Sequence, residues 1–378
     1  MTGSGGVALL GSTGSIGRSA LAVLARHRDR FPVVALAARR NRDVLADQVA
    51  RFDPSLAVLT EGEADAGWAT GPEGLIEAAT HPDVDIVVNA VVGSAGLEAT
   101  LAALRAGKRL ALANKESLVA GGELVMTALR EGGGELVPVD SEHSAILQCL
   151  PGGQARGVRR LILTASGGAF RDHSVESLER VGPEDALRHP TWDMGAKITV
   201  DSATLANKAL EVIEAHFLFG LPYDRMEAVV HPQSIIHSMV EFEDGSVLSQ
   251  MGFPTMELPI LYALTHPERL EDDGAPRFDP LAASPLTFQP VDGARFPTFR
   301  LGVEAGRSGG TAPAVFNAAN EVAVAAFLDH GLPFTGIPRV IERTLETCAP
   351  GRLDTLDALR AADGEARRRA RAFVEELS

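Results

Sequence analysis

The sequence predicts an α/β protein with a doubly wound parallel sheet at the N-terminus, a central α/β part with a mostly antiparallel sheet, and a C-terminal helical bundle. Through roughly the first 140 residues, short apolar runs alternate with helical patterns. Such continuous runs are typical of strands buried on both faces, as in a parallel sheet. Further along, two strand-like runs flank the hairpin signal Glu243-Asp244-Gly245. From Thr298 onward only helical patterns occur.

The individual elements follow from apolar spacing. Ile16, Ala20 and Leu24, for example, recur at helical intervals after the first strand-like run. The expected strands of the first sheet are Val7–Leu10, Val33–Ala38, Leu56–Leu59, Val84–Ala90, Leu110–Ala113 and Leu136–Val139. Those of the second are Leu161–Thr164, Ala228–His231, Ile235–Phe242 and Ser246–Met251. The later helices are expected over Ser202–Phe219, Ala314–Phe327, Pro338–Thr347 and Thr355–Leu377, with a long loop before the first of them, up to about Lys197.

This pattern predicts three domains and a linker. Residues 1–140 would form a cofactor-binding domain and residues 141–265 a central catalytic and dimerisation domain. Residues 266–297 are dense in Pro, Asp and Ala without a period, which is typical of a linker. Residues 298–378 would form the helical domain.

Composition excludes several classes of protein. Of 378 residues, 45% are hydrophobic and 22% charged, as in a globular protein with a real core. The formal charge of −15 makes nucleic acid an unlikely partner. Two cysteines are too few for a disulfide framework and fit a reducing compartment. No apolar stretch approaches the roughly 20 residues that span a bilayer. We therefore expect a soluble, cytoplasmic protein without a membrane partner.

A glycine-rich turn, Gly11-Ser12-Thr13-Gly14-Ser15-Ile16-Gly17, connects the first strand to the first helix. Glycines at this point allow a tight turn and bring the backbone close to a pyrophosphate at the helix N-terminus. A flexible turn is the alternative, but the strand–turn–helix context favours dinucleotide binding. The sequence therefore predicts a Rossmann-like domain.

The second strand ends in Arg39, Arg40 and Asn41 instead of an acidic residue. An arginine at this place accommodates a 2′-phosphate, so the expected cofactor is NADP and not NAD. Two solvated surface arginines are the alternative interpretation. Further along, Asn114, Lys115 and Glu116 directly follow a strand whose carboxyl end should face the ligand crevice. They could equally form a helix N-cap, and both roles can hold together.

Three acidic residues are candidate ligands of a hard cation. Asp140 and Glu142 would share one face if the strand geometry continued, although an N-cap for a helix beginning near Ser144 is the simpler interpretation. Glu211 lies with Asn207 and Lys208 on one face of the predicted helix. That face could instead be a solvated stripe with a Lys–Glu pair. Three carboxylates without clustered Cys or His suit Mg²⁺ or Mn²⁺, and Co²⁺ is a third candidate.

Two loops complete the set of candidates. The small-residue turn around Ser166, Gly167 and Gly168 could bind an anion through backbone and hydroxyl groups, although taken alone an ordinary loop is the simpler interpretation. The segment His189-Pro190-Thr191-Trp192-Asp193-Met194-Gly195 carries one of the two tryptophans of the chain. Trp192 either covers a ligand as part of a lid or is already docked as a structural residue.

Several of these segments resemble those of the 1-deoxy-D-xylulose 5-phosphate reductoisomerase family. The matching segments, spread from about residue 7 to residue 330 in the family's order, are GSTGSIG, ANKES, VDSEHSA, SGGAF, HPTWDMG, DSATLANKALEVIEA and HPQSIIHSMVEF. The resemblance implies an NADPH-dependent oxidoreductase and isomerase of the non-mevalonate isoprenoid pathway that works as a homodimer. Its sugar phosphate substrate would rearrange to a branched aldehyde, which NADPH reduces to 2-C-methyl-D-erythritol 4-phosphate.

The resemblance also implies roles for individual residues. Cofactor contacts would be Thr13, Gly14, Ser15, Ile16, Arg40, Asn41, Asn114, Glu116 and Gly195, whereas Arg39 is a candidate from its charge alone. Metal ligands would be Asp140, Glu142 and Glu211, and substrate contacts Lys115, Ser141, Ser166, His189, Ser202, Asn207 and Lys208. Trp192 and Met194 would belong to a lid. The chain departs from the family at Arg39-Arg40, where Gly-Lys is common.

Two other functions remain open from the residues alone. A semialdehyde-type NADP dehydrogenase would share the glycine-rich start but needs a nucleophilic cysteine, and neither Cys149 nor Cys348 lies in an activating context. A non-enzymatic NADP-binding regulator would not require the three carboxylates.

Overall fold

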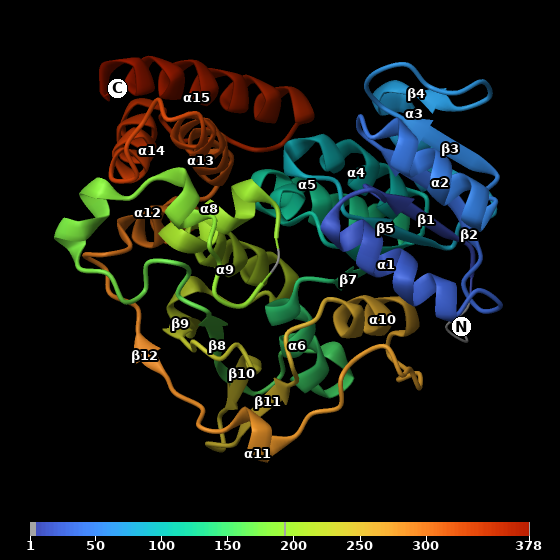
Figure 1. The fold of residues 1–378 in the computed structure, drawn as a ribbon, viewed down its shortest axis with the longest axis horizontal. Coiled ribbons are helices and arrows are strands. Elements are labelled where there is room, and N and C mark those ends of the chain that lie inside the picture. Colours follow the sequence, from blue (N-terminus) through green and yellow to red (C-terminus); the bar gives the residue numbers. More distant parts are fainter. Residues whose placement is uncertain (1–4, 193, 378) are drawn as a thin grey trace. The chain divides into compact units, whose positions relative to one another are not determined.

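The computed structural model describes residues 5–192 and 194–377, which form two compact units (Figure 1). The first unit contains the chain up to residue 117 together with residues 124–144 and 255–276. The second contains residues 118–123, 145–254 and the chain from residue 277 onward. These units are not consecutive segments, and the division at residues 140, 265 and 297 stays a prediction.

The first unit is built on a parallel sheet of seven strands in the order β4-β3-β2-β1-β5-β6-β7. Its strands are β1 Val7–Leu10, β2 Val33–Ala38, β3 Leu56–Leu59, β4 Ala69–Thr70, β5 Ile86–Asn89, β6 Arg109–Leu112 and β7 Glu135–Pro138. The predicted doubly wound sheet is confirmed, because the chain runs outward from β1 in both directions. Only β4 was not expected, since two residues are too few to produce a pattern.

Helices connect the strands of this sheet. They are α1 Ser15–Arg26, α2 Arg42–Phe52, α3 Gly71–Thr80, α4 Leu97–Arg105, α5 Lys115–Gly132 and the start of α6 Ser141–Cys149. A short 3₁₀ turn, η1, covers Gly93–Gly96. The central strands β1 and β2 are apolar and buried at every position, which explains their continuous hydrophobic runs.

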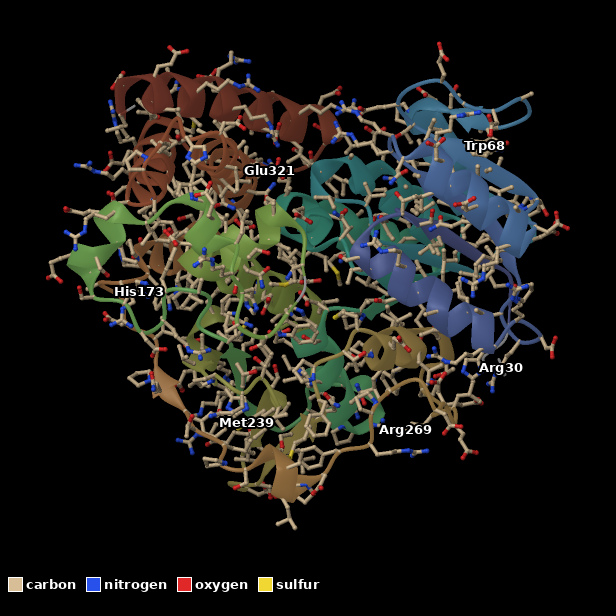
Figure 2. All side chains as sticks on the ribbon, viewed as in Figure 1. Arg30, Trp68, His173, Met239, Arg269 and Glu321 are labelled. Carbon is tan, nitrogen blue, oxygen red and sulfur yellow. The ribbon has the colours of Figure 1, made fainter. Side chains whose placement is uncertain are left out.

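Residues 255–276 belong to the first unit although they lie late in the sequence. They form helix α10, Glu257–Thr265, and the segment after it. Arg26 of α1 pairs with Glu257 at 2.6 Å and with Asp272 at 3.0 Å. Arg30, labelled in Figure 2, pairs with Glu268 at 2.8 Å. These ion pairs are partly exposed, so each contributes little alone, but together they fix this segment on the unit.

The second unit contains a mixed sheet in the order β11-β10-β8-β9-β12. Its strands are β8 Val158–Ala165, β9 Met226–Val230, β10 Ile236–Phe242, β11 Val247–Met251 and β12 Gln289–Pro290. Only the β8–β9 pair is parallel, so the predicted mostly antiparallel sheet and its hairpin are confirmed. The segment interpreted as a linker contains β12 and a short helix, α11 Pro280–Ala283. The sequence did not indicate them, because elements of two and four residues are too short to show a period.

The helix expected over Ser202–Phe219 is wrong in its first turn. The structure has two helices, α8 Ala196–Thr204 and α9 Ala206–Phe219, separated at Leu205, whose φ of +56° is left-handed. The Thr204 hydroxyl accepts a hydrogen bond from the Ala206 N–H at 3.2 Å and so caps the second helix. Leu205 is 2% exposed, and its burial holds a conformation that costs a non-glycine residue on the order of 1 kcal/mol or more.

The C-terminal bundle consists of α12 Pro297–Ser308, α13 Ala312–Leu328, α14 Gly336–Thr347 and α15 Leu356–Leu377. Arg367 of α15 forms an ion pair of 2.6 Å with Glu321 of α13, which is labelled in Figure 2, and so connects the two helices. Shorter elements complete the unit: η2 Pro151–Gly153, η3 Val175–Arg180, α7 Pro183–Ala186 and η4 Tyr223–Arg225. Within residues 5–192 and 194–377, every helix is too short or too polar to span a lipid bilayer.

Helix α12 was missed in the sequence because glycines weaken its helical pattern. Gly302 faces α9, and a Cβ at this position would lie 2.5 Å from the Ala209 Cβ and 2.7 Å from the Phe316 ring. The glycine therefore lets α12 pack closely on the helix that carries Asn207, Lys208 and Glu211. Its low helix propensity is offset by this close approach.

We predict that Gly302→Ala lowers the free energy of unfolding by about 1–3 kcal/mol, because overpacking outweighs the gain in helix propensity. The matched control is Gly364→Ala in α15, where an added Cβ meets only the Arg368 guanidinium at 3.6 Å. That variant should be more stable by about 1 kcal/mol. Chemical denaturation of both variants measures the difference, and equal stability would contradict the packing argument.

Candidate active site

The loop between β1 and α1 has the geometry of a phosphate-binding turn. Gly11 has a φ of +86°, which few residues other than glycine adopt. A Cβ at Gly17 would lie 2.3 Å from the Gly11 carbonyl oxygen, so the first turn of α1 packs directly on the loop. Gly14 is the N-cap and supplies no capping side chain, which leaves the helix N-terminus open to an anion. Three further predicted contacts are at least partly exposed there: Thr13, Ser15 and Ile16.

Arg39 and Arg40 follow β2 and share one partner. Their Nε atoms donate to the two carboxylate oxygens of Glu61 at 2.5 and 2.6 Å. The Arg39 hydrogen bond is the main reason why the pKa of Glu61 lies below its ordinary value. Both arginine side chains are about 70% exposed, so these pairs are weak and a phosphate could replace them. Asn41 caps α2 by accepting from the Val44 N–H at 3.4 Å.

Asn114 holds the loop beyond β5 to the end of β6. Its Nδ2 donates to the carbonyl oxygens of Val91 at 2.7 Å and Gly93 at 2.8 Å, and to the Glu116 carboxylate at 3.0 Å. Its Oδ1 accepts from the Ser117 hydroxyl. Asn114 occupies the N-cap position of α5, but its side chain does not cap that helix. It therefore fixes the loop after β5 at the carboxyl ends of two neighbouring strands.

Asp140 lies between β7 and α6. Its backbone oxygen accepts from the Ser144 N–H at 2.8 Å, and its Oδ1 accepts from the Ser141 N–H at 3.0 Å. The N-cap interpretation is therefore confirmed, but the helix begins at Ser141 and not near Ser144, and the strand geometry does not continue to Glu142. Asp140 also pairs with Lys115, which is 6% exposed. The Ser141 hydroxyl donates to Glu142 at 2.5 Å.

In the second unit, Ser166, His189 and Ser202 come together from three separate segments. The His189 Nε2 lies 3.0 Å from the Ser166 Oγ and 3.1 Å from the Ser202 Oγ. A Cβ at Gly168 would lie 2.5 Å from the Ser202 carbonyl oxygen, so this glycine lets the loop after β8 reach α8. The small-residue turn is thus part of a polar cluster and not an ordinary loop.

The hydrogen bonds of His189 determine its protonation. Its Nδ1 accepts from the N–H groups of Thr191 at 3.1 Å and Trp192 at 2.8 Å. Because both are backbone donors, Nδ1 carries no proton and the neutral ring has its proton on Nε2. Burial, and secondarily the positive charge of Arg171, lowers the pKa of His189 to about 4. The ring is therefore a fixed hydrogen-bond donor toward Ser166 and Ser202.

Helix α9 presents Asn207, Lys208 and Glu211 as a connected group. The Asn207 Nδ2 and the Lys208 Nζ donate to the two oxygens of the Glu211 carboxylate. Lys208 is 2% exposed and Glu211 is 1% exposed, so the alternative of a solvated stripe is wrong. A buried ion pair has a desolvation cost that can exceed its attraction, which points to a functional reason for this one.

The predicted lid residues lie just before α8. The Trp192 ring centroid is 6.3 Å from that of His237 on β10, and its backbone is held by His189. Met194 is partly buried, and Gly195 is the exposed N-cap of α8. Residue 193 lies outside the described residues. The structure thus joins the tryptophan loop to the serine–histidine cluster.

Neither cysteine has the environment of a nucleophile. Cys149 is buried at the end of α6 in an apolar cluster. Burial is also the main reason why the pKa of the Cys348 thiol is raised, which disfavours the reactive thiolate. The requirement of a semialdehyde-type dehydrogenase is therefore not met.

Each unit gathers its own set of predicted residues. The first contains the glycine loop, Arg39 to Asn41, Asn114 to Glu116, and Asp140 to Glu142. The second contains Ser166, His189, Ser202, Asn207, Lys208 and Glu211, together with the tryptophan loop.

Sequence reasoning missed several residues that support these groups. They are Asn89, Glu61, Arg171, His143 and Asp201. Asn89, for instance, ends β5 and donates to the Gly96 carbonyl oxygen and the Thr100 hydroxyl at 2.9 Å each. The position of Asn89 at the end of a strand could have indicated its role from the sequence. Glu61 and Arg171 act through contacts with residues far apart in the chain, which residue spacing does not reveal.

Three family models match most of the chain. The model described as 1-deoxy-D-xylulose 5-phosphate reductoisomerase matches residues 7–122, and two models of C-terminal domains of that enzyme match residues 136–219 and 251–369. A relative of that name from Heliobacterium modesticaldum is 55% identical, covering 98% of this chain and 97% of its own length. The chain belongs to the 1-deoxy-D-xylulose 5-phosphate reductoisomerase family. The resemblance drawn from its motifs is confirmed.

Solved structures of the family have the same fold. The Zymomonas mobilis enzyme in complex with NADPH is 46% identical with a TM-score of 0.92, and covers 99% of this chain and 100% of its own. A family structure in complex with NADPH, fosmidomycin and magnesium is 38% identical with a TM-score of 0.93, and covers 99% of both chains. The α/β architecture predicted from the sequence agrees with these family structures.

We predict that folding keeps His189 neutral well below its ordinary titration range. An unfolded histidine binds a proton below a pH of about 6.5, whereas folded His189 does so only near 4. Stability should therefore fall as the pH drops through this window, by roughly 1 kcal/mol after allowance for its partial exposure. Denaturation at pH 7 and about pH 5 should show a larger loss for the wild type than for His189→Gln. An identical loss would refute the neutral-ring assignment.

Proposed function

We propose that this chain binds NADPH and one divalent cation and converts 1-deoxy-D-xylulose 5-phosphate to 2-C-methyl-D-erythritol 4-phosphate, with the residue roles given below. Two observations carry the assignment of roles: the buried Lys208–Glu211 pair with Asn207, and the serine–histidine cluster of the same unit. Family membership and a family structure that holds NADPH and magnesium support the cofactors.

Asp140, Glu142 and Glu211 would hold the cation. All three offer carboxylate oxygens, the ligands that magnesium prefers, and Mn²⁺ or Co²⁺ could occupy the same oxygen set. When bound, the cation would act as a Lewis acid toward the ketone and hydroxyl oxygens of the substrate. Lys115 beside Asp140, and Lys208 beside Glu211, orient the carboxylates and limit their mutual repulsion.

The substrate phosphate would be bound by side-chain donors of the second unit. Ser166, Ser202, Asn207 and Lys208 supply hydroxyl, amide and ammonium groups, and the His189 Nε2–H adds a fixed donor. Ser141 and Lys115 would contact the remainder of the substrate. This local excess of donors explains how a chain with a net charge of −15 can accept an anion.

The glycine loop and the strand ends would place NADPH. Thr13, Gly14, Ser15 and Ile16 would bind the pyrophosphate at the N-terminus of α1. Arg39, Arg40 and Asn41 would bind the adenosine phosphate end. Asn114, Glu116 and Gly195 would contact the cofactor further along. Trp192 and Met194 would then cover the ligands and exclude water from the reactive aldehyde.

We also propose a homodimer formed through the second unit. Val247 and Leu248 lie on β11, an edge strand, and are 50% and 46% exposed. An edge strand with exposed apolar side chains is a surface that another chain can cover. The two free, buried cysteines favour the cytoplasm as its location.

We predict that Arg39→Ser/Arg40→Ser weakens NADPH binding selectively. Loss of charge-assisted hydrogen bonds to the 2′-phosphate, at about 1.5–3 kcal/mol each, should raise the KM for NADPH at least tenfold. The KM for NADH should barely change, because NADH lacks that phosphate. Arg42→Ser, which removes a neighbouring arginine paired with Asp65, is the control. An equal loss for both cofactors would return the arginines to a surface role.

We predict that Glu211→Gln abolishes metal-dependent turnover. Steady-state consumption of NADPH with the sugar phosphate should fall by orders of magnitude, since the Lewis acid contributes several kcal/mol to the transition state. Calorimetric affinity for Mn²⁺ should fall with it, while NADPH binding is retained. Chelator should abolish activity of the wild type.

Glu214→Gln is the matched control for this prediction. Glu214 lies three residues further along α9 and is 0% exposed, so both variants remove a buried negative charge from the same helix. The control should retain Mn²⁺ affinity. If Glu214→Gln loses the metal and Glu211→Gln keeps it, the ligand assignment is wrong.

A further inference from the structure

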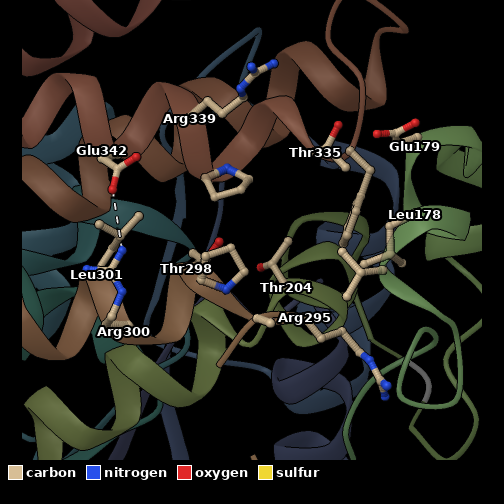
Figure 3. Close-up of a pocket in the computed structure, with 15 residues that line it drawn as sticks. Leu178, Glu179, Thr204, Arg295, Thr298, Arg300, Leu301, Thr335, Arg339 and Glu342 are labelled. Carbon is tan, nitrogen blue, oxygen red and sulfur yellow. Dashed lines mark hydrogen bonds and ion pairs between the residues drawn. The ribbon is translucent and has the colours of Figure 1, made fainter. Parts of the chain in front are cut away.

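A cavity of about 370 Å³ lies in the second unit, away from the residues assigned to substrate. It opens between η3, the first turn of α12 and the first turn of α14 (Figure 3). Ser166, His189, Ser202, Asn207 and Lys208 do not line it. Its volume is at the lower end of the range found for small-molecule sites.

The wall of this cavity combines apolar and polar side chains. Leu178, Leu301 and Phe334 form apolar surface, and Val175 is 43% exposed beside them. Thr298 lines the cavity and is 1% exposed, and its hydroxyl makes no hydrogen bond with any residue that the structure describes. This hydroxyl is therefore available to a polar atom of a ligand in the cavity.

Charges at the rim favour an anion at one end. Arg300 is already paired with Glu342 at 3.4 Å, as the dashed line in Figure 3 shows. Arg339 on α14 forms no ion pair with residues 5–192 or 194–377, so its charge is available to a ligand. The positive N-terminal ends of α12 and α14 add to it. Glu179 lies across the cavity from Arg339 and would orient the anionic group away from itself.

The cavity also contacts two segments that support the substrate residues. Val175 and Leu178 belong to η3, within the loop that runs from Ser166 to the tryptophan segment. Thr204 lies at the break between α8 and α9, where its hydroxyl links the Asp201 carbonyl oxygen to the Ala206 N–H. A ligand in the cavity would therefore hold η3 against α12 and α14.

We propose that this cavity is a binding site for a small amphipathic anion, with an apolar body against Leu178, Leu301 and Phe334 and an acidic group toward Arg339. The ligand orders η3. Any effect on substrate binding through the loop rests on the proposed function, whereas the binding itself does not.

The fluorescent anion 8-anilinonaphthalene-1-sulfonate tests the site, because it combines an aromatic body with one sulfonate. Titration is done on the full chain with saturating NADPH, which blocks the nucleotide loop. The wild type should show one saturable site. Arg339→Gln should weaken the affinity about tenfold, and Thr298→Val should weaken it less. The control Arg307→Gln removes an exposed arginine at the C-terminal turn of α12, outside the cavity, and should bind like the wild type.

Hydrogen exchange supplies an independent readout. The bound fluorophore should slow exchange of backbone amides in residues 175–180 of the wild type and not of Arg339→Gln. Absence of saturable binding, equal affinity in Arg339→Gln and the wild type, or unchanged exchange in residues 175–180 would each overturn the proposal. Because neither readout needs turnover, a failed assay for reductoisomerase activity would contradict only the proposed function.

Discussion

The left-handed turn at Leu205 is the constraint on which the arrangement of the proposed substrate-binding residues depends. It ends α8 just after Ser202 and begins α9 just before Asn207. Ser202 and Asn207 therefore lie on two separate helices and not on one continuous helix. An uninterrupted helix would have rotated these groups by 100° per residue along a single axis. The turn persists because Leu205 is buried and because the Thr204 hydroxyl bonds to the backbone on both sides of it.

A buried carboxylate supports that turn from within. Asp201 is 0% exposed, accepts from the Asn320 Nδ2 at 2.8 Å and pairs with Lys197 at 2.8 Å. Removing one partner of such a group leaves a charge without compensation, at a cost of about 3–5 kcal/mol. The bundle helix α13 is therefore connected by a polar contact to α8, the helix that carries Ser202 of the proposed substrate site. Substitution of Asn320 should therefore also change the local stability of α8.

The two proposed anion sites differ in the kind of donor that they offer. The first relies on backbone geometry, with Gly11 and Gly17 bringing N–H groups and the end of α1 together. The second relies on side chains that are themselves buried, including Lys208 and the neutral ring of His189. Backbone sites tolerate a long, extended cofactor, whereas buried side-chain donors are costly to desolvate and fix a small substrate more precisely. The net negative charge of the chain does not prevent anion binding at these two sites, because their donors act at short range.

The sequence by itself determined the parallel sheet, the glycine loop and the identities of the acidic and basic residues that could act. These features are local, because strand runs, helical spacing and turn glycines depend on neighbours along the chain. Only the tertiary structure decided that Lys208 and Glu211 are buried instead of solvated, that Asn114 supports a loop instead of capping a helix, and that residues 255–276 join the first unit. It also decided the break at Leu205 and the close approach at Gly302, which depend on contacts between elements far apart in sequence. Burial and long-range hydrogen bonding leave no periodic trace, and this is why spacing alone could not predict them.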